Sequence, residues 1–278
     1  TVPGQRAILL FSPGLAFLET FLACLYAGIV SVPLYPPRNR RHWNRLHCVM
    51  SDADASLVLT TSDRLSRIRD WSATSANPVI LPQTRLLAID SLTEANTGHW
   101  QPQTLAPDRT VLLQYTSGST SAPKGVMVSH ANLNNNLDIL CRVFELTRDC
   151  ITVSWLPHYH DMGLIEGHLM PLYAGGTVYL MSPAAFLQQP IRWLAAISKY
   201  RATHTAAANF AFDLCVESIS EEERAGLDLG DLRTVLNGAE PIRHETVEKF
   251  IATFSSCGFR ADAMCPGYGL AETTLLVT

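Results

Sequence analysis

Residues 114–130 read Gln-Tyr-Thr-Ser-Gly-Ser-Thr-Ser-Ala-Pro-Lys-Gly-Val-Met-Val-Ser-His and contain the strongest motif of the chain. An apolar run at 110–115 predicts a strand, which leads into a loop of hydroxyl residues and glycines and then into an Asn-rich helix. This order is typical of phosphate binding, because loop N–H groups and hydroxyls can converge on phosphate oxygens. The candidate phosphate-binding residues are Thr116, Ser117, Gly118, Ser119, Thr120 and Lys124.

The position of Lys124 separates this loop from the Walker motif. A Walker loop requires Gly-Lys-Ser/Thr, whereas Pro123-Lys124-Gly125 stands here, so the lysine precedes its glycine. The pattern therefore excludes a P-loop kinase or GTPase. Judged by composition alone, a Ser/Thr/Gly loop is more often a simple connection than a nucleotide site.

Composition limits the classes of protein to consider. The 278 residues are 47% hydrophobic and 17% charged, which predicts a folded globular protein of one or two domains. The net charge of −4 offers no general attraction to nucleic acid or to an anionic membrane. Seven cysteines without a C-x-x-C pair indicate reduced core residues, and hence a cytoplasmic protein. The most apolar segment, 17–35, is interrupted by Glu19, Gly28 and Pro33, so no membrane span is expected.

Strands and helices alternate along the chain. A strand at 7–11, a helix ending before Gly28 and a strand at 29–35 predict a β-α-β unit with a parallel sheet. The alternation restarts after Asp149. We therefore predict an α/β fold of two successive units with largely parallel sheets, 1–147 carrying the phosphate loop and 148–278 carrying the later motifs.

Polar residues follow three predicted strands of the second unit. Pro157–Gly163 comes after the strand at 151–156, where open α/β sheets place ligands. His158 and His160 could ligate a metal, but the H-x-H-x-D-H pattern would need Asp and His at 162 and 163, so burial in the core is the stronger alternative. By spacing alone, 237–241 is a turn and helix start, and 267–272 is a core tyrosine followed by a surface glutamate.

One basic cluster stands out early in the chain. Its arginines alternate with aromatic residues, and either a solvated surface or a docking patch for an acidic partner would explain them. The cluster consists of Arg38, Arg40, Arg41 and Arg45 with His42, Trp43 and His47.

The loop string Tyr115–Thr120 with Pro123-Lys124-Gly125 closely resembles the phosphate-binding signature of the adenylate-forming enzymes, although that signature commonly has Gly where Ser121 stands. Four motifs occur in that superfamily's order over 114–272. In detail the chain resembles the fatty acyl-AMP ligases over essentially its whole length, through Tyr35–Arg38, Leu113–Tyr115, Leu156–Leu164, Gly238–Pro241 and Tyr268–Glu272.

This resemblance implies a ligase that uses ATP and Mg²⁺ to activate a fatty acid as acyl-AMP, releases pyrophosphate and transfers the acyl group to an acyl carrier protein or polyketide synthase. It also implies that these residues form the large N-terminal domain of such an enzyme, truncated at both ends. The small C-terminal domain with its catalytic lysine would then lie outside the chain, and this piece alone is expected to be inactive.

The resemblance also assigns roles to residues. Lys124 would hold the ATP phosphates, and His160 would stand at the mouth of the acyl site, beside the carboxylate to be activated. Gly238, Ala239, Glu240 and Pro241 would pack against adenine, as would Tyr268 with Gly269. Glu272 would bind Mg²⁺, while Ala271 replaces a threonine that is usual in the family.

Two alternatives remain open. An acyl-CoA synthetase or a peptide-synthetase adenylation domain shares these motifs, and thioester formation with free coenzyme A would separate the first from an acyl-AMP ligase. A non-catalytic nucleotide-binding remnant would bind ATP but would not exchange pyrophosphate.

Overall fold

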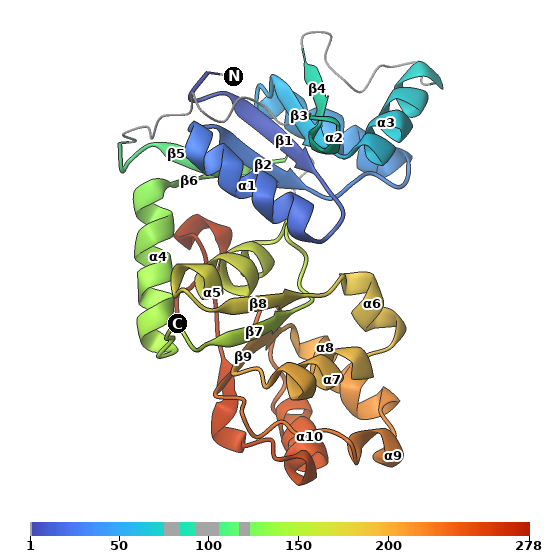
Figure 1. Ribbon diagram of the computed structural model, residues 1–278, viewed down its shortest axis with the longest axis vertical. Helices are drawn as coiled ribbons and strands as arrows, with labels where there is room; N and C mark the ends of the chain where they lie inside the picture. Colours follow the sequence, from blue (N-terminus) through green and yellow to red (C-terminus); the bar gives the residue numbers. More distant parts are fainter. Residues whose placement is uncertain (1, 75–83, 93–105, 117–122) are drawn as a thin grey trace. The chain divides into compact units, whose positions relative to one another are not determined.

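The computed structural model describes residues 2–74, 84–92, 106–116 and 123–278. The chain divides into two compact units, Thr1–Leu133 and Asn134–Thr278, each of which is described by itself. Both are mixed α/β structures built on one sheet (Figure 1). The predicted fold class is confirmed, and the domain boundary placed at 147 and 148 stays a prediction.

The first unit contains a six-stranded sheet in the order β4-β3-β1-β2-β5-β6. Five strands are parallel, and β6 pairs antiparallel with β5. Its strands are β1 Arg6–Leu10, β2 Val30–Leu34, β3 Leu57–Thr60, β4 Arg85–Ala88, β5 Thr110–Tyr115 and β6 Gly125–Ser129. Its helices are α1 Leu15–Ala27, α2 Arg40–Asp52, α3 Ser62–Thr74 and the short η1 Ile89–Ser91, and α4 His130–Val143 continues into the second unit.

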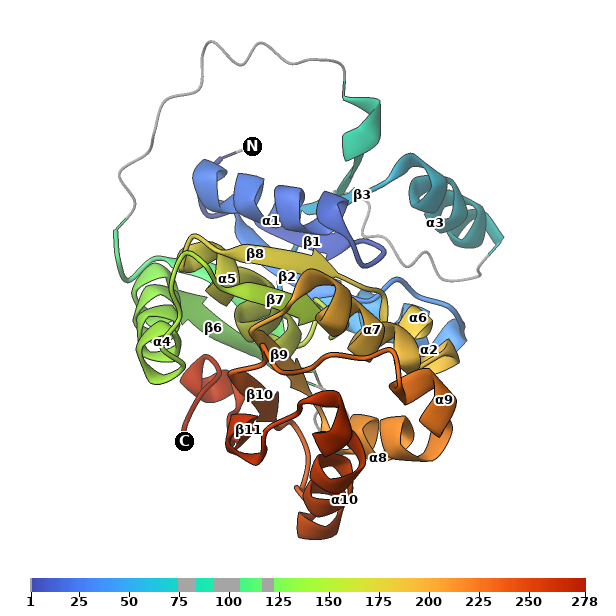
Figure 2. The same cartoon turned by 60° about the horizontal axis from the view of Figure 1, so that its bottom comes forward.

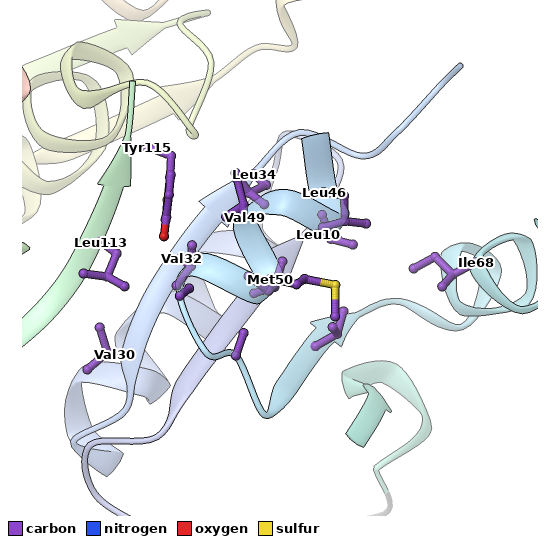
Figure 3. Packing of buried hydrophobic residues seen from close by; sticks show 14 of the residues in the cluster. Leu10, Val30, Val32, Leu34, Leu46, Val49, Met50, Ile68, Leu113 and Tyr115 are labelled. Carbon is purple, nitrogen blue, oxygen red and sulfur yellow. The ribbon is translucent and has the colours of Figure 1, made fainter. Parts of the chain in front are cut away.

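Helix α2 closes the apolar core of the first unit. Its buried side chains Leu46, Val49 and Met50 pack with strand residues such as Leu10 and Val32 (Figure 3). Asn39 begins the helix, since its side chain accepts a hydrogen bond from the His42 N–H at 3.0 Å. The buried residues of α2 are all apolar, and most of its polar side chains lie at the surface, as expected of an amphipathic helix on a sheet.

Strand β6 corrects the predicted strand, loop and helix order. Gly125–Ser129 is a strand antiparallel to β5, so the phosphate loop connects two strands and does not lead directly into a helix. At the start of the helix, the Ser129 hydroxyl accepts the Asn132 N–H at 3.1 Å, and the Asn132 side chain accepts the Ser129 N–H at 3.0 Å. This reciprocal pair satisfies donors at the start of α4.

The second unit contains a five-stranded parallel sheet in the order β11-β10-β9-β7-β8. Figure 2 shows β9, β10 and β11 side by side. The strands are β7 Ile151–Ser154, β8 Thr177–Leu180, β9 His204–Ala207, β10 Thr234–Asn237 and β11 Met264–Pro266. The helices are the π-helix η3 Met162–Leu169, α5 Met170–Tyr173, α6 Pro183–Gln188, α7 Ile191–Tyr200, α8 Asn209–Ser218, α9 Glu221–Arg224 and α10 His244–Phe254, with 3-10 turns η4 Ser255–Cys257, η5 Ala261–Ala263 and η6 Ala271–Thr273.

Aromatic rings fill one face of this second sheet. Trp155 stacks on Phe186 at 4.1 Å between ring centroids, and Trp193 lies edge-on to both. The Trp193 Nε1–H donates to the Thr205 hydroxyl at 2.9 Å, which docks α7 on β9. The contacts continue through Phe212 to Phe250, so α8 and α10 are packed on the same layer.

Among the helices in the described ranges, none is both long and apolar enough to cross a membrane. The cytoplasmic location inferred from the cysteines stays a prediction.

Candidate functional site

The base of the phosphate loop is held within the first unit by Tyr115. Tyr115 pairs with Gly125 across β5 and β6, and a Cβ at position 125 would lie 2.8 Å from the tyrosine ring. The phenol donates to Asp52 Oδ2 at 2.5 Å. Burial and then this bond raise the pKa of Tyr115, so the phenol keeps its proton. The Tyr115 ring therefore leaves space only for a glycine at position 125.

Two predicted phosphate-binding residues can be placed at the ends of the loop. The carbonyl of Thr116 accepts a hydrogen bond from Arg45 Nη2 at 2.9 Å, and Lys124 is exposed. Ser117, Gly118, Ser119 and Thr120 lie outside the described residues. Sequence reasoning grouped Arg45 with the surface arginines, whereas its guanidinium is partly buried against the loop.

The other predicted residues belong to the second unit, where three of its parallel strands deliver them to one edge of the sheet. His160 follows β7, Gly238–Pro241 follows β10, and Tyr268 with Gly269 follows β11. Because parallel strands end at the same edge, these motifs share the side of the sheet at which α/β proteins bind ligands. A Cβ added to Gly238 would lie 3.1 Å from the carbonyl oxygen of Gly267, so the last two segments approach each other closely.

His160 is oriented by its neighbour in the chain. Its Nδ1 lies 2.7 Å from Asp161 Oδ1, and 52% of its side chain is exposed. The bond with Asp161 raises the pKa of His160 above its ordinary value. The same nitrogen lies 3.4 Å from the Met162 backbone nitrogen, so Nδ1 is engaged by both residues that follow it.

His158 occupies a different environment from His160. It is buried, with its ring 5.5 Å from that of Tyr159 and perpendicular to it. The expectation of a core histidine therefore holds for His158 and not for His160.

The segment after Asp161 is the π-helix η3. All eight of its residues are buried. A Cβ at Gly163 would collide with the carbonyl oxygen of Pro157, so the chain turns tightly as it leaves the histidine segment. Burial lowers the pKa of His168, whose Nδ1 contacts the carbonyl of Gly163 and closes the turn. Such helices are rare and often mark functional sites.

Glu166 is a buried carboxyl group that sequence reasoning missed. It is 2% exposed, and its Oε2 has no hydrogen-bond partner among the residues that the structure describes. Burial raises its pKa from 4.5 to about 8. A neutral acid inside η3 is thus favoured near neutral pH.

The segment Gly238–Pro241 has an unusual backbone. Ala239 has a φ of 70°, a conformation that few residues other than glycine adopt. The Gly238 N–H donates to the carbonyl of Ala207 at 3.1 Å, and Glu240 Oε1 accepts the Phe210 N–H at 2.6 Å. The carboxylate of Glu240 is therefore engaged at the start of α8.

Tyr268 presents its ring to solvent, with 62% of the residue exposed. Its N–H donates to Thr278 O at 2.7 Å, and its carbonyl accepts the Val277 N–H at 2.9 Å, which fixes the backbone beneath the ring. Glu272, on η6, is exposed. No group of three or more His, Cys, Asp or Glu residues in the described part of the chain could by itself hold a metal ion. Glu272 fits Mg²⁺ as a single ligand, because Mg²⁺ is commonly held by one or two carboxylates together with substrate phosphates.

The basic cluster is mostly at the surface of the first unit. Arg38, Arg40 and Arg41 are exposed, and no ion pair formed by the described residues includes them. Arg40 and Arg41 also lie in the first turn of α2, where the helix dipole disfavours cations. The docking patch for an acidic partner stays a prediction.

Comparison with known families adds an independent observation. The sequence matches the family of AMP-binding enzymes over residues 1–278. The chain belongs to this family. The resemblance stated from the motifs is thereby confirmed.

Two relatives of this AMP-binding enzyme are named as ligases of fatty acids. It is 45% identical over 278 residues to the medium-chain-fatty-acid–[acyl-carrier-protein] ligase JamA of Moorena producens (strain JHB), and the match covers 99% of this chain and 47% of JamA. It is 35% identical over 309 residues to the ligase of the same description, TtuA, of Teredinibacter turnerae, covering 99% of this chain and 48% of TtuA. The chain therefore spans about half the length of these relatives.

A solved structure is similarly close. The fatty acyl-adenylate ligase of Legionella pneumophila, in complex with acyl adenylate and pyrophosphate, superposes with a TM-score of 0.92 at 43% identity. The match covers 100% of this chain and 48% of that one. The α/β architecture of the AMP-binding enzyme is thus that of a known adenylate-forming domain.

Proposed function

We propose that the protein to which this chain belongs activates a fatty acid as an acyl-adenylate and transfers the acyl group to an acyl carrier protein or polyketide synthase. The observation that most supports the proposal is the common edge of the second sheet, where His160, Gly238–Pro241 and Tyr268 follow three parallel strands. The names of JamA and TtuA support a medium-chain acid and a carrier protein as the substrates.

In the proposed reaction a carboxylate oxygen of the fatty acid attacks the α-phosphorus of ATP. The bond between that phosphorus and the bridging oxygen breaks, and pyrophosphate leaves. The protein contributes alignment and neutralisation of charge, which are the main sources of catalysis in phosphoryl and nucleotidyl transfer. Lys124 and the loop hydroxyls would neutralise the β- and γ-phosphates, while Asp161 holds His160 in one orientation beside the acyl carboxylate.

Adenine would bind between the exposed ring of Tyr268 and the backbone of Gly238–Pro241. A Cβ at Gly238 would lie 3.1 Å from the carbonyl oxygen of Gly267, so a side chain there would crowd the neighbouring segment, and flat backbone surfaces of this kind suit an aromatic base. Mg²⁺, held through Glu272, would supply positive charge to the phosphates.

The test is ATP–pyrophosphate exchange by the full-length gene product across fatty acids of increasing chain length. We expect exchange that depends on the fatty acid and is largest for medium chains. Acyl transfer is then measured with a phosphopantetheine-loaded carrier protein and with free coenzyme A. Efficient thioester formation with coenzyme A would favour an acyl-CoA synthetase, and ATP binding without exchange would indicate a non-catalytic protein.

A further inference from the structure

Asn209 is the first residue of α8 and follows the alanines at the end of β9. It contacts the residues at both ends of Gly238–Pro241, which is called the adenine segment below. Its Oδ1 accepts the Arg243 N–H at 3.1 Å and a hydrogen bond from Asn237 Nδ2 at 3.4 Å. Asn237 is the last residue of β10 and Arg243 immediately precedes α10. One amide oxygen therefore joins the two residues between which Gly238–Pro241 is suspended.

The Asn209 side chain is itself fixed in one orientation. Its Nδ2 donates to the Thr246 hydroxyl at 3.2 Å, and that hydroxyl donates to Asp213 Oδ2 at 2.9 Å. Asn209 is 3% exposed and Asn237 is 0% exposed, so solvent cannot replace these bonds without opening the fold. The amide nitrogen of Asn209 is thus bound to α10, while the amide oxygen accepts the hydrogen bonds from Asn237 and Arg243.

The neighbouring residue adds a third contact to the same segment. Glu240 Oε1 accepts the Phe210 N–H at 2.6 Å, so the first two residues of α8 bind the segment at its start, middle and end. These contacts explain how Ala239 is held at a φ of 70°, a conformation that costs free energy in an unsupported loop. The shape of the segment is therefore imposed by α8.

We infer that Asn209 is a positioning residue that sets the backbone of Gly238–Pro241 for recognition of the adenine base. The inference rests on the proposed function, in which backbone groups of this segment face the edge of adenine. A displacement of these backbone groups by a fraction of an ångström lowers both the affinity and the selectivity for the base, because hydrogen bonds are sensitive to distance and angle. Loss of the Asn209 hydrogen bonds to Asn237 and Arg243 should therefore affect both the affinity for ATP and the preference for ATP over GTP.

The experiment compares variants of the full-length gene product in fatty-acid-dependent pyrophosphate exchange with ATP and with GTP. For Asn209→Ala we expect KM for ATP to rise about tenfold, kcat to change less, and the ATP over GTP preference to fall. Asn209→Asp keeps the acceptor oxygen and should remain closer to wild type in KM and preference. Glu240→Ala, at an exposed position, should give the same changes to a smaller extent, and it provides the test if Asn209→Ala does not fold.

Thr205→Val is the matched control for lost stability. Thr205 is buried in the same sheet and makes two hydrogen bonds, from Trp193 Nε1 at 2.9 Å and to Val153 O at 2.7 Å, neither of which involves the adenine segment. It should lower the melting temperature and leave KM for ATP and the base preference unchanged. An unchanged KM and preference in Asn209→Ala, or the same changes in Thr205→Val, would overturn the inference. Absence of exchange by the wild-type protein would instead overturn the proposed function.

Discussion

Glu166 shows how one buried group makes stability depend on pH. Its folded-state pKa of about 8 exceeds the ordinary 4.5, so between these values the folded protein retains a proton that the unfolded chain has released. The free energy of unfolding should therefore fall as pH rises through this window, by up to about 1.4 kcal/mol per pH unit, and the contribution levels off above pH 8.

Glu166→Gln should remove that dependence, since the amide has no proton to lose. We expect the variant to gain stability relative to wild type as pH increases from 5 to 8, as measured by urea denaturation at each pH. Glu222→Gln, at an exposed position of α9, is the control and should track wild type at every pH. Parallel curves for wild type and Glu166→Gln would contradict a protonated carboxyl in η3.

Lys124 is exposed beside the phosphate loop, so its contribution should be to binding and charge, with little effect on folding. Lys124→Ala should lower kcat/KM for ATP about ten- to a hundred-fold, the loss of a charge-assisted hydrogen bond. Lys249→Ala, an exposed lysine of α10, is the control in the same exchange assay. Equal kinetics for the two variants would remove Lys124 from the site.

Glu272 offers a separate test of the Mg²⁺ assignment. Glu272→Gln keeps the size of the side chain and removes its charge, so the enzyme should need more Mg²⁺ to reach half-maximal exchange. The measurement is a Mg²⁺ titration at fixed ATP. A titration that superposes on that of wild type would show that the carboxylate does not hold the metal.

At the scale of elements, the π-helix η3 depends on a residue without a side chain. Gly163→Ala would place a methyl group against the carbonyl oxygen of Pro157, a backbone atom that cannot rotate away. We expect a loss of about 1–3 kcal/mol in the free energy of unfolding, typical of overpacking. Gly226→Ala is the matched control, since a Cβ there meets no atom within 4 Å, and it should be neutral or slightly stabilising. A change in Gly163→Ala as small as that in Gly226→Ala would show that the backbone shifts enough to relieve the collision.

Most elements follow from the sequence because their periodicity is local. Apolar runs such as 57–60 and the spacing of Leu133, Leu137 and Leu140 reflect burial on one face, which the sequence displays directly. Strand β6 could not be recognised in this way, because what defines it is pairing with β5 across the phosphate loop. The π-helix could not be recognised either, since its apolar run contains no signal for the wider turn.

The candidate site could be proposed from the sequence only where its motifs are contiguous. Gly238–Pro241 and Tyr268 stand in short contiguous motifs, whereas Asn209 and Arg45 form hydrogen bonds with residues far along the chain. Asn209 meets Asn237 and Arg243 only once β9 and β10 are paired, and Arg45 meets Thr116 only once α2 packs on the first sheet. Long-range contacts of this kind leave no local pattern.

At the scale of the whole molecule, the residues at the end of β9 favour one class of carboxylic acid as the substrate. Ala206 and Ala207 are buried at the end of β9, and Asp213 accepts a hydrogen bond from Thr246. An α-ammonium group placed beside these alanines would lack a dedicated carboxylate, and burying it unpaired is costly. Dodecanoate should therefore drive pyrophosphate exchange better than any amino acid, with dodecan-1-ol, which lacks the carboxylate, as the blank. Faster exchange with an amino acid would contradict this preference.

The strand orders of the two sheets also bear on how the chain can fold as it leaves the ribosome. In the second unit β8 pairs with β7, and then β9, β10 and β11 each join the free edge left by an earlier strand. In the first unit β3 and β4 extend one side of the β1–β2 pair, and β5 and β6 extend the other. Among the strands that the structure describes, none has to be inserted between two that are already paired. Each sheet can therefore grow outward during synthesis, and the slowest step expected in the first unit is the arrival of β5, whose Leu112 pairs with Ser31 of β2.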